Sequence, residues 1–218
     1  LYTATKTYSE VISNIERDCN SAKKYWHFIK VMGRSASHVA LECALQTQPN
    51  ICLIGEEVAA KKQSLSEIAD QIADSVATRG NAGNNFGVAI IPEGIVEFVP
   101  EFSKLIAEIN ELLAGEKTEQ FNALPSWDEK YAFIEKGLTP ESMAVFAILP
   151  VGIQQQLFLE RDPHGNVQVS LIESEKLFAE LVKNKLAERK AAGTYKGKFA
   201  TLTHFFGYEG RCAFPSNF

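Results

Sequence analysis

Residues 25–34 have the sequence YWHFIKVMGR, in which a run of aromatic and aliphatic side chains ends at Met32-Gly33-Arg34. Such a run predicts a buried strand over residues 25–32, because aromatic and β-branched residues favour strands. The apolar spacing in residues 5–23 predicts an amphipathic helix before this strand, and residues 35–48 predict a second helix after it. A buried strand between two helices indicates an α/β fold.

The alternation of helix and strand patterns continues beyond residue 48. Residues 51–54 and 86–91 are short apolar runs that predict two more buried strands. Between them, Ser64 and Glu67 form a capping-box pattern at the start of a helix that extends to about Thr78. Strands that alternate with helices predict a mainly parallel sheet flanked by helices on both faces.

The second half of the chain is predicted to be mostly helical. Helix-start patterns occur at Ser126 with Glu129 and at Thr139-Pro140, and residues 173–190 form a charged amphipathic pattern. Residues 199–204 then predict a return to a strand. The sequence therefore predicts an α/β lobe made of residues 1–108 and 194–218, with a mostly helical insert at residues 109–193.

Composition limits the classes of function. The 218 residues carry a formal net charge of -5, which argues against a nucleic-acid partner because a phosphate backbone requires a basic surface. No apolar run approaches the roughly 18 residues that span a membrane, and no signal-peptide pattern is present. The cysteines form no CxxC pair and have no neighbouring histidine cluster, so we expect reduced thiols in a cytoplasmic protein and no metal site. They are Cys19, Cys43, Cys52 and Cys212.

Polar residues follow two of the predicted strands, at the position where open α/β sheets bind ligands. Gly33 allows a ligand to approach the backbone closely, and Arg34 offers a forked donor to phosphate or sugar oxygens. A simple turn with a solvated arginine is the alternative. Glu93 can accept hydrogen bonds from sugar hydroxyls, or it can cap the next helix.

Two further segments are candidates for binding. Lys24-Tyr25 can contact a phosphate, or its lysine can cover an apolar edge while the ammonium stays in water. In the segment Tyr208-Glu209-Gly210-Arg211, the arginine is a candidate phosphate ligand, the tyrosine is a hydroxyl donor and the glutamate can orient the arginine. A surface turn with a weak ion pair is the alternative for this segment.

Together these segments resemble the long form of the pyrophosphate-dependent phosphofructokinases. The resemblance rests on SAKKYWHFIKVMGRSASH at residues 21–38, IPEG at 91–94 and FGYEGR at 206–211. Each motif alone is weak, but the three occur in family order across nearly the whole chain. The resemblance implies the family's reaction in glycolysis and gluconeogenesis. Pyrophosphate reversibly phosphorylates the 1-hydroxyl of fructose 6-phosphate, giving fructose 1,6-bisphosphate and orthophosphate.

The resemblance also implies a role for each segment. Met32 to Arg34 match the family's central sugar-phosphate motif, and Glu93 matches its sugar-binding glutamate. Tyr208 to Arg211 match the segment that closes over the 6-phosphate. Lys24 and Tyr25 match positions that reach into a partner subunit, which implies a homodimer. The implied substrate-binding residues are Lys24, Tyr25, Met32, Gly33, Arg34, Glu93, Tyr208, Glu209, Gly210 and Arg211.

Other parts of the family's active site are not found in this sequence. The loop that holds pyrophosphate and magnesium, and the aspartate that activates the sugar 1-hydroxyl, are expected before Leu1, which indicates a piece of a longer chain. We therefore assign no catalytic residue and no Mg²⁺ ligand here, and we expect these 218 residues alone to be inactive. An ATP-dependent relative and a non-catalytic regulatory subunit are the alternatives.

Overall fold

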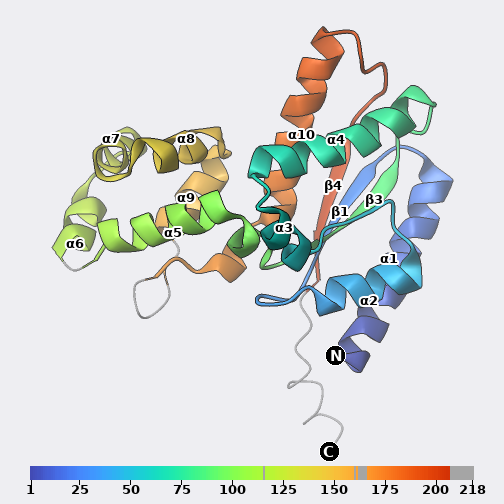
Figure 1. Ribbon diagram of the computed structural model, residues 1–218, viewed down its shortest axis with the longest axis horizontal. Helices are drawn as coiled ribbons and strands as arrows, with labels where there is room; N and C mark the ends of the chain where they lie inside the picture. The colour runs from blue at the N-terminus through green and yellow to red at the C-terminus, as the bar shows by residue number, and fades with distance from the viewer. Residues whose placement is uncertain (115, 160, 162–165, 207–218) are drawn as a thin grey trace, which may run out of the picture.

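A four-stranded parallel sheet forms the centre of the protein, with helices on both faces (Figure 1). The computed structural model describes residues 1–114, 116–159, 161 and 166–206. The strands lie in the order β2-β3-β1-β4, and all three pairings are parallel. They are β1 (Trp26–Val31), β2 (Ile51–Cys52), β3 (Gly87–Pro92) and β4 (Thr201–Phe205). The prediction of a mainly parallel sheet flanked by helices is confirmed.

Strands β1 and β3 form the middle of the sheet, and all six residues of each are buried. Their register pairs Trp26 with Gly87 and Val31 with Pro92, so the two strands end at the same edge. On the other side of β1, Lys30 pairs with Phe205 at the end of β4. The ends of β1, β3 and β4 therefore meet at one edge of the sheet, which we call the carboxyl edge.

Two pairs of helices cover the sheet. Helices α1 (Tyr2–Ala22) and α2 (His38–Thr47) pack on one face, where Ile12 and Ile29 are completely buried. Helices α4 (Leu65–Asn81) and α10 (Ser174–Ala191) pack on the other face. Burial on both faces explains the nearly continuous apolar sequence of the central strands.

The start of α4 confirms the predicted capping box. The Ser64 hydroxyl accepts a hydrogen bond from the Glu67 amide, and the Glu67 carboxylate accepts one from the Ser64 amide. Near the middle of α4, ion pairs join this helix to α10. Asp70 lies 3.0 Å from Lys185 Nζ, and Asp74 lies 2.7 Å from Arg189 Nη1. These contacts fix the two helices to one another along the sheet.

The segment between β3 and α10 is helical, as predicted. Its elements are the 3-10 helix η1 (Ile95–Phe98), α5 (Pro100–Leu112), α6 (Glu116–Ala123), α7 (Trp127–Gly137), α8 (Pro140–Ile148), α9 (Val151–Leu159) and the 3-10 helix η2 (Val169–Leu171). Hydroxyl caps start two of these helices, since Ser126 accepts from the Glu129 amide and Thr139 accepts from the Ser142 amide. Pro150 separates α8 from α9.

The helical segment and one face of the sheet share a hydrophobic core. The buried cluster that contains Phe28 and Ile72 at the sheet continues to Phe121 and Phe146 among α6 to α9. Helix α10 lies inside the predicted insert range, yet it packs on β1, β4 and α4 (Figure 1). The division into a lobe and an insert at residues 109–193 stays a prediction. The hydrophobic core is continuous across the predicted boundary.

The described cysteines are free thiols, of which Cys19 and Cys43 are buried. Burial raises the pKa of the Cys52 thiol to about 12. Cys212 lies outside the described residues. Within the described ranges, none of the helices combines the length and the apolar character that crossing a membrane requires.

Candidate functional site

The loops that follow β1 and β3 are joined at the carboxyl edge. The Glu93 amide donates to the Val31 carbonyl (2.9 Å), and the Gly94 amide donates to the Gly33 carbonyl (3.0 Å). The backbone pairing of the two strands therefore continues beyond their ends. As a result, the structure brings together the Met32–Arg34 segment and Glu93, which lie far apart in the sequence.

Two glycines are required for this close approach. Gly33 has a φ of +141°, and a Cβ atom there would lie 2.8 Å from the Ala36 carbonyl oxygen. A Cβ atom on Gly94 would lie 1.9 Å from the Arg34 carbonyl oxygen, which is shorter than any non-bonded contact allows. Both positions need a residue without a side chain, for conformation at Gly33 and for space at Gly94.

Arg34 and Glu93 place opposite charges on these two loops. Arg34 Nε lies 3.8 Å from Glu93 Oε1, and the two side chains are 63% and 12% exposed. An ion pair at this distance, with one partner in solvent, contributes little to stability. The Glu93 carboxylate is mostly buried, whereas the guanidinium presents much of its surface to solvent. The pair can therefore offer both an acceptor for hydroxyls and a cation for an anionic group.

Glu97 is a third charged residue near this pair, and the sequence analysis did not single it out. Desolvation raises the pKa of the Glu97 carboxyl, the Arg34 guanidinium acts in the opposite direction, and the Glu93 carboxylate adds to the increase. Its distance from Glu93 along the sequence is the signal that points to Glu97. Glu97 lies four residues after Glu93, in η1, where a tight turn keeps the chain near the edge.

The loop after β1 is braced by helix α3 (Gly55–Lys61), which the sequence analysis missed. The Ser37 hydroxyl accepts from the Gly55 amide (2.8 Å), and the Ser37 amide donates to Glu56 Oε1 (2.9 Å). That amide is the main reason why the pKa of the Glu56 carboxyl is lowered. These contacts explain why α2 begins at His38 and not at residue 35, as its sequence pattern predicted.

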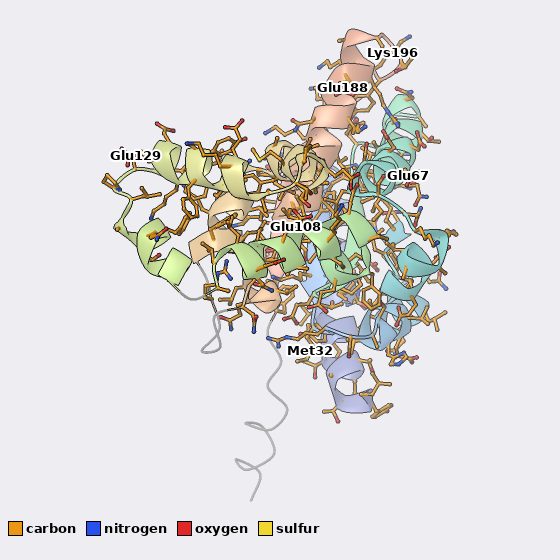
Figure 2. The ribbon with its side chains drawn as sticks, turned by 60° about the vertical axis from the view of Figure 1, so that its left-hand side comes forward. Met32, Glu67, Glu108, Glu129, Glu188 and Lys196 are labelled. Carbon is orange, nitrogen blue, oxygen red and sulfur yellow. The ribbon has the colours of Figure 1, made fainter. Side chains whose placement is uncertain are left out.

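Lys24 and Tyr25 lie at the opposite edge of the sheet. Both are exposed and precede β1, whose six residues extend over roughly 20 Å at about 3.3 Å per residue. In Figure 2, Met32 lies in the lower half of the view, and Lys196, in the segment that precedes β4, lies at the top. The structure does not bring Lys24 and Tyr25 to the site formed by Arg34 and Glu93 of the same chain.

The remaining predicted site residues are not placed. Tyr208, Glu209, Gly210 and Arg211 lie outside the described residues. Strand β4, which precedes them, ends at the carboxyl edge beside β1.

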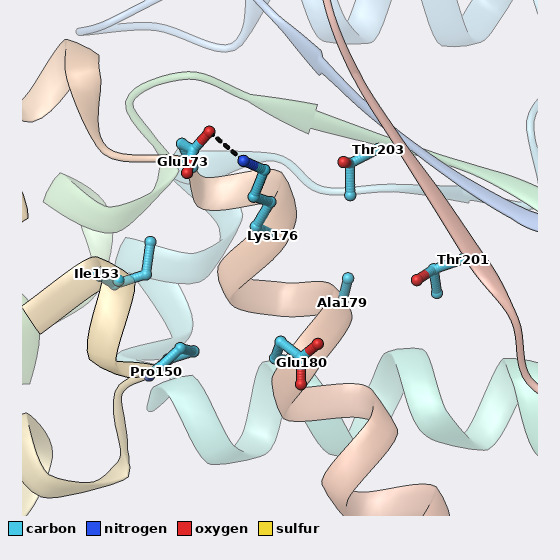
Figure 3. Close-up of a pocket in the computed structure, with 9 residues that line it drawn as sticks. Pro150, Ile153, Glu173, Lys176, Ala179, Glu180, Thr201 and Thr203 are labelled. Carbon is cyan, nitrogen blue, oxygen red and sulfur yellow. Dashed lines mark hydrogen bonds and ion pairs between the residues drawn. The ribbon is translucent and has the colours of Figure 1, made fainter.

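A cavity of about 300 Å³ lies between α9, α10 and the outer strand β4 (Figure 3), and neither Arg34 nor Glu93 lines it. Lys176 is its one cation among the lining residues and is paired with Glu173, as the dashed line in Figure 3 marks. Glu180 adds a further negative charge to the lining. This lining therefore carries more negative than positive charge, which disfavours an anionic ligand in the cavity.

Metal binding has no support among the residues that the structure describes. In those ranges, no group of three or more His, Cys, Asp or Glu side chains is arranged to hold a metal ion. The charged residues at the carboxyl edge therefore do not fit a magnesium site.

Comparison with known proteins shows similarity to phosphofructokinases. Residues 1–146 match the family described as Phosphofructokinase. The chain is 56% identical to the pyrophosphate–fructose 6-phosphate 1-phosphotransferase of Treponema pallidum (strain Nichols) and 55% identical to the protein of that name from Porphyromonas gingivalis. It is 52% identical to subunit beta 1 of the same transferase from Arabidopsis thaliana. Each alignment covers 99% of this chain but only 38%, 39% and 36% of the relative, so the chain spans well under half of their length.

Proposed function

The chain belongs to the phosphofructokinase family, and from this we propose that it forms the fructose 6-phosphate-binding part of a pyrophosphate-dependent phosphotransferase. The complete protein would reversibly transfer a phosphoryl group from pyrophosphate to the 1-hydroxyl of fructose 6-phosphate. The names of the relatives support pyrophosphate as the donor. The observation that carries the proposal is the pair of loops at the carboxyl edge, which hold Arg34 beside Glu93.

The roles of these residues follow from their chemistry. We assign Arg34 to an anionic or oxygen-rich part of the sugar phosphate, because a guanidinium remains charged at any working pH and donates in a planar fork. We assign Glu93 to sugar hydroxyls, because an ionised carboxylate only accepts hydrogen bonds. Gly33 and Gly94 allow the two loops to pack closely and so set the geometry in which Arg34 and Glu93 meet. Arg211 is the second phosphate-binding residue of the proposal, with Tyr208, Glu209 and Gly210 beside it.

The donor half of the reaction is assigned to other parts of the complete protein. Mg²⁺, when bound, neutralises charge on pyrophosphate and on the transferring group. Its ligands and the catalytic base are proposed to lie outside this chain, and we derive no step through the ion. Lys24 and Tyr25 are proposed to contribute to the site of a partner subunit in a homodimer. Their exposure at the edge opposite Arg34 supports that assignment. The proposed compartment is the cytoplasm.

A donor assay on the full-length protein tests the proposal. Fructose 6-phosphate is supplied with Mg²⁺ and either pyrophosphate or ATP, and fructose 1,6-bisphosphate is measured. We expect turnover with pyrophosphate and little with ATP. Turnover with ATP alone would identify an ATP-dependent relative instead. Binding of fructose 6-phosphate without turnover on either donor would identify a regulatory subunit.

A further inference from the structure

Lys30 is a buried lysine in strand β1, whose other residues are apolar except for His27. Its side chain is 3% exposed, and its neighbours Ile29 and Val31 are completely buried. A charge removed from water is tolerated when it is paired and hydrogen-bonded. The partners of Lys30 therefore show which parts of the molecule this charge connects.

Three groups from two other segments, one around the start of α10 and one at the end of β4, surround the Lys30 ammonium. Nζ donates to the Ile172 carbonyl at 3.2 Å and lies 3.4 Å from Glu175 Oε2. It also lies 4.3 Å from the centroid of the Phe205 ring, within the range of a cation–π interaction. The Glu175 side chain is 5% exposed, and its Oε2 atom accepts no hydrogen bond within the described residues. The ion pair with Lys30 is thus the contact that compensates the charge at this oxygen.

These contacts lie at the carboxyl edge of the sheet. Lys30 precedes Met32 by two residues, and it pairs in register with Phe205, the last residue of β4. Glu175 is in the first turn of α10, where a carboxylate also interacts favourably with the helix dipole. The ammonium therefore ties the ends of β1 and β4 to the start of α10.

Stability alone is a weak explanation for this arrangement, since buried ion pairs are often no more stabilising than apolar residues of similar size. An ion pair does restrict geometry, because a displaced partner leaves a buried charge uncompensated. We propose that Lys30 and Glu175 are positioning residues, which hold the end of β1, and hence Met32–Arg34, in the geometry that binds the sugar phosphate. This inference rests on the proposed function.

A double replacement in the full-length protein separates positioning from stability. Lys30→Met and Glu175→Met each leave one buried charge unpaired, so both single variants are expected to have a lower melting temperature. The double variant, which buries no charge, is expected to recover most of that loss. Its KM for fructose 6-phosphate is nevertheless expected to rise by about 10-fold or more, because small displacements of binding groups are costly. The KM for pyrophosphate is expected to stay unchanged.

Lys185→Met is the matched control. It removes an ion pair of the same helix, with Asp70 of α4, that lies away from the carboxyl edge. We expect this variant to keep the wild-type KM. A double variant with both wild-type stability and a wild-type KM would show that the pair is only structural and would overturn the proposal.

Hydrogen exchange keeps this test independent of the proposed function. In the double variant, we expect the amides of residues 32–34 to exchange faster than in the wild type. If the wild-type protein does not phosphorylate fructose 6-phosphate, the proposed function fails, and the exchange rates still decide whether Lys30 and Glu175 position the loop. Unchanged exchange at residues 32–34 would contradict that role.

Discussion

At the scale of single residues, the candidate site depends on a charged pair and on the glycines that allow the pair to form. Arg34 is exposed and Glu93 is nearly buried, so the arginine is the side chain that is free to meet a ligand. Gly94 determines how closely the two loops approach, because its missing Cβ leaves room for the Arg34 carbonyl. Substitutions at these positions separate binding chemistry from backbone geometry.

Replacing Arg34 with alanine in the full-length protein should raise the KM for fructose 6-phosphate by roughly 10- to 100-fold, the range of one hydrogen bond to a charged group. Arg34→Lys should recover only part of the loss, because an ammonium cannot donate in a planar fork. Steady-state kinetics with varied sugar phosphate measures both effects. Wild-type kinetics in Arg34→Ala would remove Arg34 from the site.

Gly94→Ala should disturb the site through the backbone. Its Cβ would lie 1.9 Å from the Arg34 carbonyl oxygen, so the two loops have to separate. We expect a lower melting temperature together with a higher KM for fructose 6-phosphate. Gly152→Ala in α9 is the control, since its Cβ would meet no atom within 4 Å. Equal behaviour of the two variants would contradict the importance of the close approach.

At the scale of secondary-structure elements, local patterns predicted most of the helices and strands well. The capping box at Ser64 and the hydroxyl caps at Ser126 and Thr139 lie where the sequence indicates. Helix α3 was missed because its seven residues follow a short apolar strand without a cap pattern. The start of α2 was misplaced because contacts between Ser37 and α3 override helix propensity there.

A pair of histidines links β1 to β4 and predicts a pH-dependent stability. His27 Nδ1 lies 3.0 Å from His204 Nε2. Burial lowers the pKa of His27, with a smaller contribution from His204 in the same direction and an opposing one from Asp18. Burial also lowers the pKa of His204. The unfolded chain therefore binds protons first as the pH falls below about 6.5, and the folded state loses stability from that pH downward.

Denaturant unfolding at pH values between 7.5 and 5 measures this loss. His204→Gln removes one of the two titrating rings, so the free energy of unfolding should fall less steeply with decreasing pH than in the wild type. The largest slope that one histidine can add is about 1.4 kcal/mol per pH unit. His38→Gln, at an exposed position of α2, is the control. Identical pH profiles for the wild type and His204→Gln would contradict the assignment.

At the scale of the whole molecule, one hydrophobic core extends from the sheet into the helices between β3 and α10. A shared core predicts that the lobe and the helical segment unfold together, although the sequence alone suggested an insert. The two tryptophans report on the two parts separately. Trp26 lies in β1, and Trp127 begins α7.

Single-tryptophan variants test this cooperativity. Trp127→Phe leaves a fluorescence signal from the sheet, and Trp26→Phe leaves one from the helical segment. For each variant, we expect the fluorescence midpoint in denaturant to coincide with the midpoint of its own circular dichroism signal, as in a two-state transition. A midpoint for the helical segment that differs from the dichroism midpoint would support an independent insert instead.

The sequence was sufficient to predict the parallel α/β sheet and the loops at the strand ends, because these follow from local periodicity, caps and glycines. The motif YWHFIKVMGR marked both β1 and the segment that carries Arg34. The sequence could not reveal the brace from α3 or the contact between Lys30 and Ile172, residues 142 positions apart. Such contacts depend on how distant segments pack. Lys30 lies in a mostly apolar stretch of sequence, and only the tertiary structure places Glu175 and Phe205 beside its charge.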